Sequence, residues 1–209
     1  LTTAQIGDLA TTQIAALSTT QIAAIEVADV AKLAITQLNQ MVTTQIEALN
    51  AKQIAALTST QISGMGTTQV GYLGATQIAA IEAADVASMT AAQLNKLVTT
   101  QLNALNAKQM GALTTTQIGS LDGTRITNLS ATQVSGLSLA QVKAITAAQI
   151  SSMESTDLNA LKATQIAALV TTQLQGLTTA QVGDLSATQI KGLTTAQIGD
   201  LATTQIAAL

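Results

Sequence analysis

The chain has 209 residues and contains no histidine, cysteine, tryptophan, phenylalanine or proline; its single aromatic residue is Tyr72. The side chains that most often serve as general bases, thiol nucleophiles or soft metal ligands are therefore missing. A serine or threonine nucleophile would need a lysine beside it, and the seven lysines are scattered along the chain. We therefore expect no catalytic residues and no enzyme activity.

Charge and long apolar runs are also scarce. Only 9% of the residues are charged, the net charge is −3, and the eight basic residues occur singly, so we expect no nucleic-acid partner. No apolar run approaches the ~18 residues of a membrane span, so we expect no membrane insertion. The absence of cysteine fits an extracellular location, and the first residue, a leucine, suggests a piece of a longer protein.

What the chain does contain is one repeated unit of eight residues. It divides into 26 such octads without insertions, with one leucine left over. Position 1 is Leu in 19 octads, Ile in 3 and Met in 4; position 5 is Gln in 22; position 6 is always Ile, Val, Leu or Met. We expect these three positions to carry the fold. In the first two octads they are Leu1, Gln5, Ile6, Leu9, Gln13 and Ile14.

The octad favours a short helix followed by a break. In a continuous α-helix, each octad would rotate the apolar stripe by ~80° and wind it around every face. In a continuous strand, positions 1 and 6 would point to opposite sides. Position 2 and Gln at position 5 have the spacing of a capping box, while positions 1 and 6 have that of a hydrophobic staple. We therefore expect Gln165 to act as half of a cap, so that Gln165→Ala costs about 0.5 to 1 kcal/mol.

Helices of about six residues are unstable alone, so neighbouring units must stack. The sequence thus predicts an all-α fold, a tight α-solenoid of 26 eight-residue helix-turn repeats with positions 1 and 6 in its core. Small residues at positions 7 and 8 would allow close approach of neighbouring turns and a bend at each helix end. The alternative is a β-solenoid, in which Thr and Ile favour strands and Gln side chains form ladders.

Longer repeats indicate how the array is organised. Residues 25–80 align without gaps with 81–136, and residues 1–17 recur letter for letter at 193–209. We interpret residues 1–209 as a single uninterrupted array and a window of a longer one. Since a solenoid without polar capping repeats exposes its core, we expect self-association or continuation of the same array at both ends.

In four octads an acidic residue at position 2 accompanies the loss of Gln at position 5. One such pair is Asp122 with Arg125, which we interpret as a cap with an ion pair. The other three pairs offer two carboxylates each; we interpret them as rewritten helix caps, with a Ca²⁺ site as the alternative hypothesis. These calcium candidates are Glu26, Asp29, Glu82, Asp85, Glu154 and Asp157.

The octads resemble the Leu-Thr-Thr-x-Gln-Ile-x-Ala arrays of very large secreted bacterial proteins that are labelled as adhesion or haem-utilisation proteins. The resemblance covers the whole chain and implies an extracellular or cell-surface location. Since only Tyr72 or a methionine is available as a haem ligand, we expect no cofactor.

Two functions remain open at this stage. The first is a rod-like spacer or filament in an extracellular or cell-surface bacterial assembly or adhesin. The second is a binding module for an unidentified surface or polymer ligand. It would use regular threonine faces for ice or sugar, or the acidic pairs for Ca²⁺.

Overall fold

The computed structural model describes residues 3–209, and all regular structure in that range is helical. The predicted all-α solenoid is confirmed, and the β-solenoid alternative is wrong, because no strand occurs among the described residues. The chain divides between Ala112 and Leu113 into two compact units. Each unit is described by itself below.

The first unit contains fourteen helices among its described residues. They are α1 (Thr3–Gly7), α2 (Thr11–Ala15), α3 (Thr19–Ala23), α4 (Val27–Val30), α5 (Ile35–Leu38), α6 (Thr43–Ala48), α7 (Ala51–Ala55), α8 (Ser59–Gly64), α9 (Thr67–Tyr72), α10 (Ala75–Ala80), α11 (Ala83–Val86), α12 (Ala91–Lys96), α13 (Thr99–Asn103) and α14 (Ala107–Ala112).

The second unit contains twelve helices of the same kind. They are α15 (Thr115–Ser120), α16 (Gly123–Thr127), α17 (Ala131–Ser135), α18 (Leu139–Ala144), α19 (Ala147–Ser152), α20 (Ser155–Asn159), α21 (Ala163–Ile166), α22 (Thr171–Gly176), α23 (Thr179–Gly183), α24 (Ala187–Gly192), α25 (Thr195–Asp200) and α26 (Thr203–Ile206).

Each octad forms one helix of four to six residues and a short extended connection. At the connection between α6 and α7, for example, Leu49 and Asn50 both have extended backbone angles. No residue in the described range has a positive φ angle, so the bend does not use a left-handed glycine. The bend is made by two extended residues at positions 1 and 2.

The predicted capping box is present in many octads. The Ser18 side chain accepts a hydrogen bond from the Gln21 amide N–H, and the Gln21 side chain accepts one from the Ser18 N–H. Where position 2 is apolar only the second half forms, as at Val42, whose N–H donates to Gln45. The Gln half is thus the more regular part of the cap.

The core of each unit consists of the residues at positions 1 and 6. Every apolar side chain that is buried among the described residues occupies one of these two positions. Position 6 is the deeper one: Ile78 and Leu102 are at most 1% exposed, while Leu105 at position 1 is 2% exposed. This confirms the core that the octad pattern predicts, within each unit.

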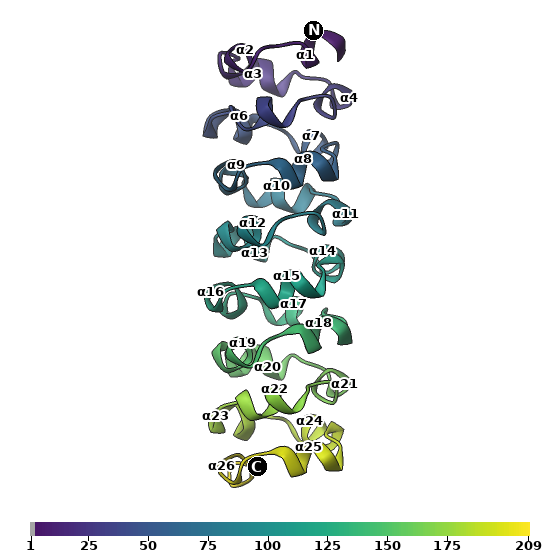
Figure 1. Cartoon of the computed structure of the whole chain (residues 1–209), viewed down its shortest axis with the longest axis vertical. Coiled ribbons are helices and arrows are strands. Elements are labelled where there is room, and N and C mark those ends of the chain that lie inside the picture. The colour runs from purple at the N-terminus through teal and green to yellow at the C-terminus, as the bar shows by residue number, and fades with distance from the viewer. Residues whose placement is uncertain (1–2) are drawn as a thin grey trace. The chain divides into compact units, whose positions relative to one another are not determined.

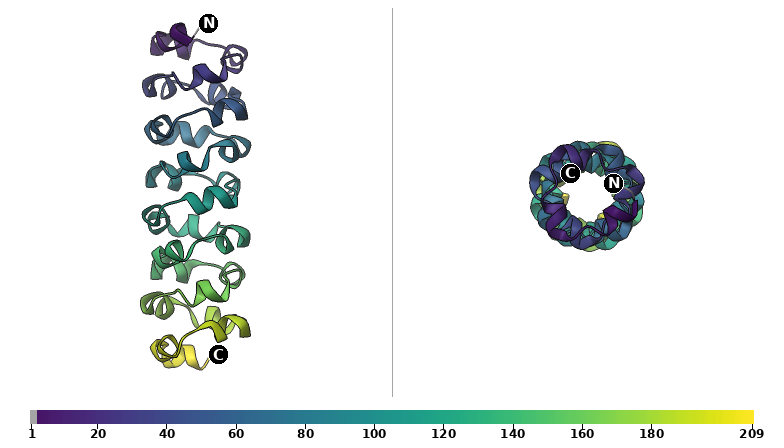
Figure 2. Two further views of the ribbon diagram at one scale, coloured as in Figure 1. Left: turned by 90° about the vertical axis from the view of Figure 1, so that its right-hand side faces the viewer. Right: turned by 90° about the horizontal axis from the view of Figure 1, so that it is seen from above.

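Helices pack against helices three octads away within the same unit. Contacting pairs include α1 with α4 and α2 with α5 in the first unit, and α19 with α22 in the second. The windings that this produces are visible in Figure 1 and, from another side, in Figure 2. Side-chain hydrogen bonds between windings join residues 25 to 31 apart in sequence. One turn of the solenoid takes three and a half octads, which is the separation between Gln45 and its acceptor Leu17.

Small residues let neighbouring turns approach closely. A Cβ atom on Gly176 in α22 would lie 2.9 Å from the Ala147 Cβ and 3.0 Å from the Ala147 carbonyl oxygen in α19. Gly192 in α24 has the same relation to Ala163 in α21, whose carbonyl oxygen would lie 3.0 Å away. At these two sites glycine at position 8 allows the turns to pack closely, which agrees with the expectation from the sequence.

We predict that Leu102→Asp and Ile78→Asp each strongly destabilise the protein, by at least about 3 kcal/mol, because each places a carboxylate in an apolar core. Thermal melts followed by circular dichroism measure the loss. Thr100→Asp is the control, since Thr100 is exposed in the first turn of α13 and should tolerate the charge. An unchanged melting temperature for either core variant would contradict the assignment.

Candidate functional site

The glutamine at position 5 forms hydrogen bonds in two directions. The Gln53 Oε1 accepts a hydrogen bond from the Asn50 N–H at 2.8 Å, which caps its own helix α7. Its Nε2 donates to the carbonyl oxygens of Ile22 at 3.0 Å and Ile25 at 2.8 Å, in the preceding turn of the solenoid. The Gln53 side chain is fully buried. One carboxamide thus both caps its own helix and ties it to the turn before.

This inter-turn bridge recurs with a fixed spacing. The acceptors are the carbonyl oxygens 31 and 28 residues earlier, which belong to position 6 and to the following position 1. Because successive turns are offset by half an octad, the start of each helix lies beside a helix end and its connection in the preceding turn, which supply these two carbonyls. Glutamines donating to that position 1 carbonyl are Gln37, Gln45, Gln53, Gln61, Gln77, Gln93, Gln101 and Gln109 in the first unit, and Gln141, Gln149, Gln165, Gln173, Gln181, Gln189, Gln197 and Gln205 in the second.

The capping interpretation of the sequence missed this second role. A capping box accepts Glu as readily as Gln, because only the side-chain oxygen is used. Yet none of the 26 octads has Glu at position 5. That absence was the available signal, since an amide can donate to a carbonyl and an ionised carboxylate cannot.

Gln69 uses a variant of the bridge. Asn39, at position 7 of an earlier octad, donates from Nδ2 to the Gly64 carbonyl at 3.0 Å and accepts from the Gly66 N–H at 2.7 Å. The Gln69 Nε2 then donates to the Asn39 carbonyl at 2.9 Å. The Asn39 side chain therefore supplies the hydrogen bond to the Gly66 N–H that a position 5 glutamine makes in other octads, and the two turns remain joined.

The residues of the first two octads lie at the edge of the first unit. Ile6 and Ile14 are each 1% exposed, and Leu9 is half-buried. Gln5 and Gln13 are exposed, unlike the bridging glutamines of later turns. Leu1 lies outside the described residues.

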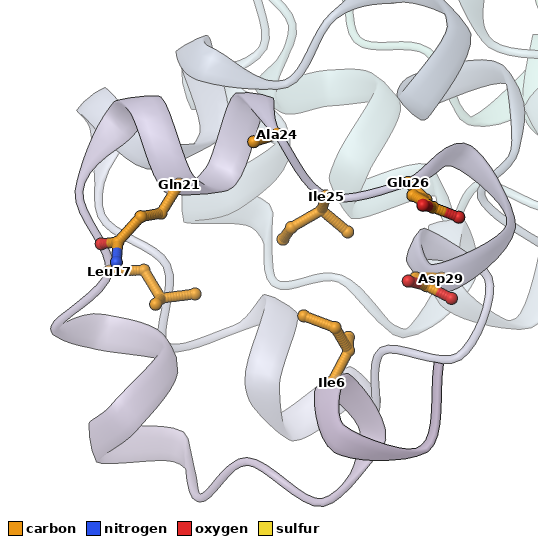
Figure 3. A pocket seen from close by; sticks show the side chains of 7 residues that line it. All are labelled: Ile6, Leu17, Gln21, Ala24, Ile25, Glu26 and Asp29. Atoms are coloured by element: carbon orange, nitrogen blue, oxygen red, sulfur yellow. The ribbon is translucent and has the colours of Figure 1, made fainter. Parts of the chain in front are cut away.

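The acidic pair Glu26 and Asp29 lines a pocket at the same edge. Figure 3 shows Ile6, Leu17 and Ile25 around the apolar part of this pocket, with the two carboxylates on one side. Asp29 is 2% exposed, and its Oδ1 has no hydrogen-bond partner. Glu26 starts α4 but makes no side-chain cap. The structure therefore brings these two calcium candidates together.

The other two acidic pairs lie within the units. In the pair Glu82 and Asp85, the Asp85 Oδ1 accepts a short hydrogen bond from the Ser59 hydroxyl. Glu82, like Glu154, makes no side-chain cap. Among the described residues no group of three or more acidic, His or Cys side chains is placed to hold a metal ion.

Asp157 is buried, and burial raises its pKa above the usual 3.8, with a smaller contribution from the negative charge of Glu154. The pair Asp122 and Arg125 differs, because Asp122 caps α16 by accepting from the Arg125 N–H at 2.9 Å. Its other oxygen lies 3.3 Å from the Arg125 guanidinium. The cap interpretation thus holds for this pair, while the three glutamates form no such hydrogen bond.

The threonine faces are not continuous rows. Because a turn takes three and a half octads, position 3 of one turn lies in register with position 7 of the next. Gly71, for example, stands one turn after Thr43 and one turn before Thr99. Hydroxyl groups therefore alternate with small side chains along a unit, which does not favour the regular lattice that ice binding would need.

The chain matches a family model described as the ALTTAQ repeat. The matched segments are residues 22–59, 78–115, 86–123 and 150–187, which together cover more than half of the chain. No curated protein shows a significant sequence match. In the described range, every helix is too short to span a lipid bilayer.

We predict that Gln165→Glu destabilises the protein at pH 7 by about 2 kcal/mol or more. The carboxylate still accepts from the Lys162 N–H. It cannot replace the buried hydrogen bond that the Gln165 Nε2 donates to the Leu137 carbonyl at 2.7 Å in the parent. A purely capping role would leave stability unchanged or improve it, because Glu is a good capping-box residue. Gln165→Ala should cost at least as much, which exceeds the roughly 0.5 to 1 kcal/mol expected for half a cap alone.

The control for that measurement is Gln13→Glu. The Gln13 Oε1 accepts from the Ala10 N–H at 2.7 Å, but its amide donates to no carbonyl among the described residues. Its melting temperature should therefore stay close to that of the parent. Equal losses for the two variants would refute the bridging role.

We predict that Asp157→Gln stabilises the protein at pH 7 and that Asp157→Asn does so less. Both remove a buried charge, but only Gln is long enough to reach the carbonyls of Ile126 and Leu129, which stand at the positions that accept the other bridges. Because the folded-state pKa of Asp157 is raised, the ionised group weakens the fold above that pKa. The parent regains this stability as the pH falls through the raised pKa toward 3.8, so the advantage of Asn should shrink in melts between pH 7 and pH 3.5.

Proposed function

We propose that this chain, which belongs to the ALTTAQ repeat family, is a structural spacer whose task is to set a distance and supply a stack of identical turns. The main support is that the buried glutamine amides form hydrogen bonds within the fold. The glutamine amides that could bind a ligand donate instead to backbone carbonyls of the neighbouring turn, as Gln93 does to Ile62 and Met65 at 2.7 Å. The most regular polar feature of the chain is thus used within the fold.

The sequence resemblance extends this proposal to a biological setting. We place the spacer in an extracellular or cell-surface bacterial assembly or adhesin, as a rod or filament segment. The lack of cysteine is compatible with that setting. Within each unit the principal helix contacts join helices three octads apart in adjacent turns, so we expect that length can change by whole turns without loss of the fold.

Deletion of residues 25–80 tests the spacer function. This removes seven octads, equal to two turns, and joins Ala24 to Ile81, which stands at the same octad position as Ile25. A spacer should keep its helical circular-dichroism spectrum and cooperative melting, and lose length in proportion to the residues removed. Small-angle X-ray scattering measures the maximum dimension of the shortened and parent proteins.

The matched control deletes residues 25–76, which is nearly the same length but is not a whole number of octads. Its junction joins Ala24 directly to Gln77 and lacks the position 1 residue and the helix start that precede Gln77, so the stack is interrupted and the melting temperature should fall. If the deletion of 25–80 also unfolds the protein, or leaves the maximum dimension unchanged, the spacer proposal fails.

A second candidate, a Ca²⁺-binding module, has one observation in its favour. The unpartnered Asp29 Oδ1 lies in a pocket beside Glu26, where a cation would meet two carboxylates. Ca²⁺ needs six or more oxygen ligands, so water and backbone would have to supply the rest. Melts with and without Ca²⁺ on the parent and on Asp29→Asn separate the two functions. A rise in melting temperature that Asp29→Asn abolishes would favour binding, and an ice-recrystallisation assay tests the threonine faces.

A further inference from the structure

Four charged residues of the first unit are arranged with one charge in each successive turn. Glu26 and Glu82 are seven octads apart, as are Lys52 and Lys108, so the members of each pair face the same direction two turns apart. Lys52 follows Glu26 by 26 residues and Glu82 follows Lys52 by 30, while a turn takes 28. The four residues therefore form a column in the order acid, base, acid, base, which we call the charge column.

The charge column runs along one side of the first unit. Glu26 starts α4, Lys52 lies in α7, Glu82 starts α11 and Lys108 lies in α14. Helix α4 contacts α7, α7 contacts α10, which ends two residues before Glu82, and α11 contacts α14. In Figure 1 the labels of α4, α7, α11 and α14 follow one another down the right-hand side of the ribbon.

The fold itself does not use these four charges. All four side chains are exposed, and within the described range none of them forms an ion pair or a side-chain hydrogen bond. Glu82 and Lys108 line one hollow between their two turns without pairing with each other. The hollow is also lined by Ile81, Ala83, Ala84, Asn106 and Gln109. The acid and the base are thus both open to charges from outside the chain.

The order of the charges is self-complementary when a second copy runs in the opposite direction. Reversed, the column reads base, acid, base, acid, so Glu26 faces Lys108 of the other copy and Lys52 faces its Glu82. Each of these pairs occurs twice. In a parallel arrangement in register, every charge would face its own sign. Since complementary charges set the register of an interface, the column selects a two-fold, antiparallel arrangement.

We propose that the charge column is a lateral docking surface for the charge column of a second, antiparallel copy of this chain. Four ion pairs between exposed side chains give a weak contact that salt disrupts, because water and ions screen them. The contact uses the same surface on both copies, so it closes into a dimer. This goes beyond the proposed spacer function, which concerns the length of a single chain, by stating how two chains pair side by side.

Two variants make the charge column uniform in sign. Glu26→Lys/Glu82→Lys leaves four lysines, and Lys52→Glu/Lys108→Glu leaves four glutamates. Both variants should fold, which circular dichroism checks. Lys162 already occupies the octad position of the two glutamates at the start of α21. A carboxylate in the first turn of α7 or α14 interacts favourably with the helix N-terminus.

A third variant is the matched control. Glu26→Lys/Lys52→Glu/Glu82→Lys/Lys108→Glu exchanges all four charges, so it keeps both the net charge of −3 and the alternating order. Reversed, its column is again complementary to itself. It should therefore associate like the parent, whereas a contact that needs these particular residues for another reason would be lost.

The experiment is sedimentation velocity across a concentration series at about 20 mM and about 1 M salt. At low salt the parent should pass from 21.2 kDa to twice that mass, and at high salt it should remain at 21.2 kDa. Each uniform-sign variant should associate at least about tenfold more weakly at low salt. An equimolar mixture of the two should form a dimer, because four lysines then face four glutamates.

A parent that stays monomeric at low salt overturns the proposal. So do uniform-sign variants that associate as the parent does, since the contact then lies elsewhere. A mixture or a charge-exchanged variant that stays monomeric overturns it as well, because both retain complementary columns. The spacer function is judged by the length of one chain after the deletion of residues 25–80, so its failure is distinguishable from the failure of this lateral contact.

Discussion

The fold depends on one side-chain amide that satisfies backbone groups of two successive turns at once. Its oxygen closes the start of a helix and its nitrogen reaches a carbonyl at the end of another, 28 to 31 residues away. Without this connection, the ends of the very short helices in residues 3–209 would leave many polar groups buried without hydrogen-bond partners. A charged residue cannot replace the amide, because a carboxylate lacks the donor and a lysine lacks the acceptor.

Apolar packing and the amide bridges place different demands on the octad. Core positions 1 and 6 accept Leu, Ile, Val or Met, since a stack of turns needs apolar volume more than one particular shape. Position 5 is Gln in 22 of the 26 octads, and two of the four exceptions show why other residues are rare. The Asp85 side chain is too short to form the bridge and instead accepts a hydrogen bond from the Ser59 hydroxyl. The Arg125 guanidinium donates to the Asp122 carboxylate. Each of these two exceptions has a compensating partner nearby.

The helix and its cap follow from local chemistry, so the sequence predicts them well. Thr58 and Gln61 form the reciprocal cap that their spacing indicates, and Ile62 is buried as position 6 requires. The number of octads in a turn depends on contacts between residues a whole turn apart, which an eight-residue pattern does not encode directly. The bridge from Gln61 to Leu33 was therefore missed, although the absence of Glu at position 5 pointed to it. The same long-range contacts decide whether Asp29 or Asp85 has a partner.

The half-octad offset between turns constrains how such a chain can lengthen. Since a turn takes three and a half octads, a segment of seven octads is the shortest that contains both whole octads and whole turns. Residues 25–80 and 81–136, which align without gaps, are segments of that length. In the first unit, Glu26 and Glu82, or Lys52 and Lys108, consequently face the same direction two turns apart. Recombination in steps of seven octads would copy a surface without rotating it, whereas any shorter gain of octads would keep the fold and turn every later surface residue to a new side.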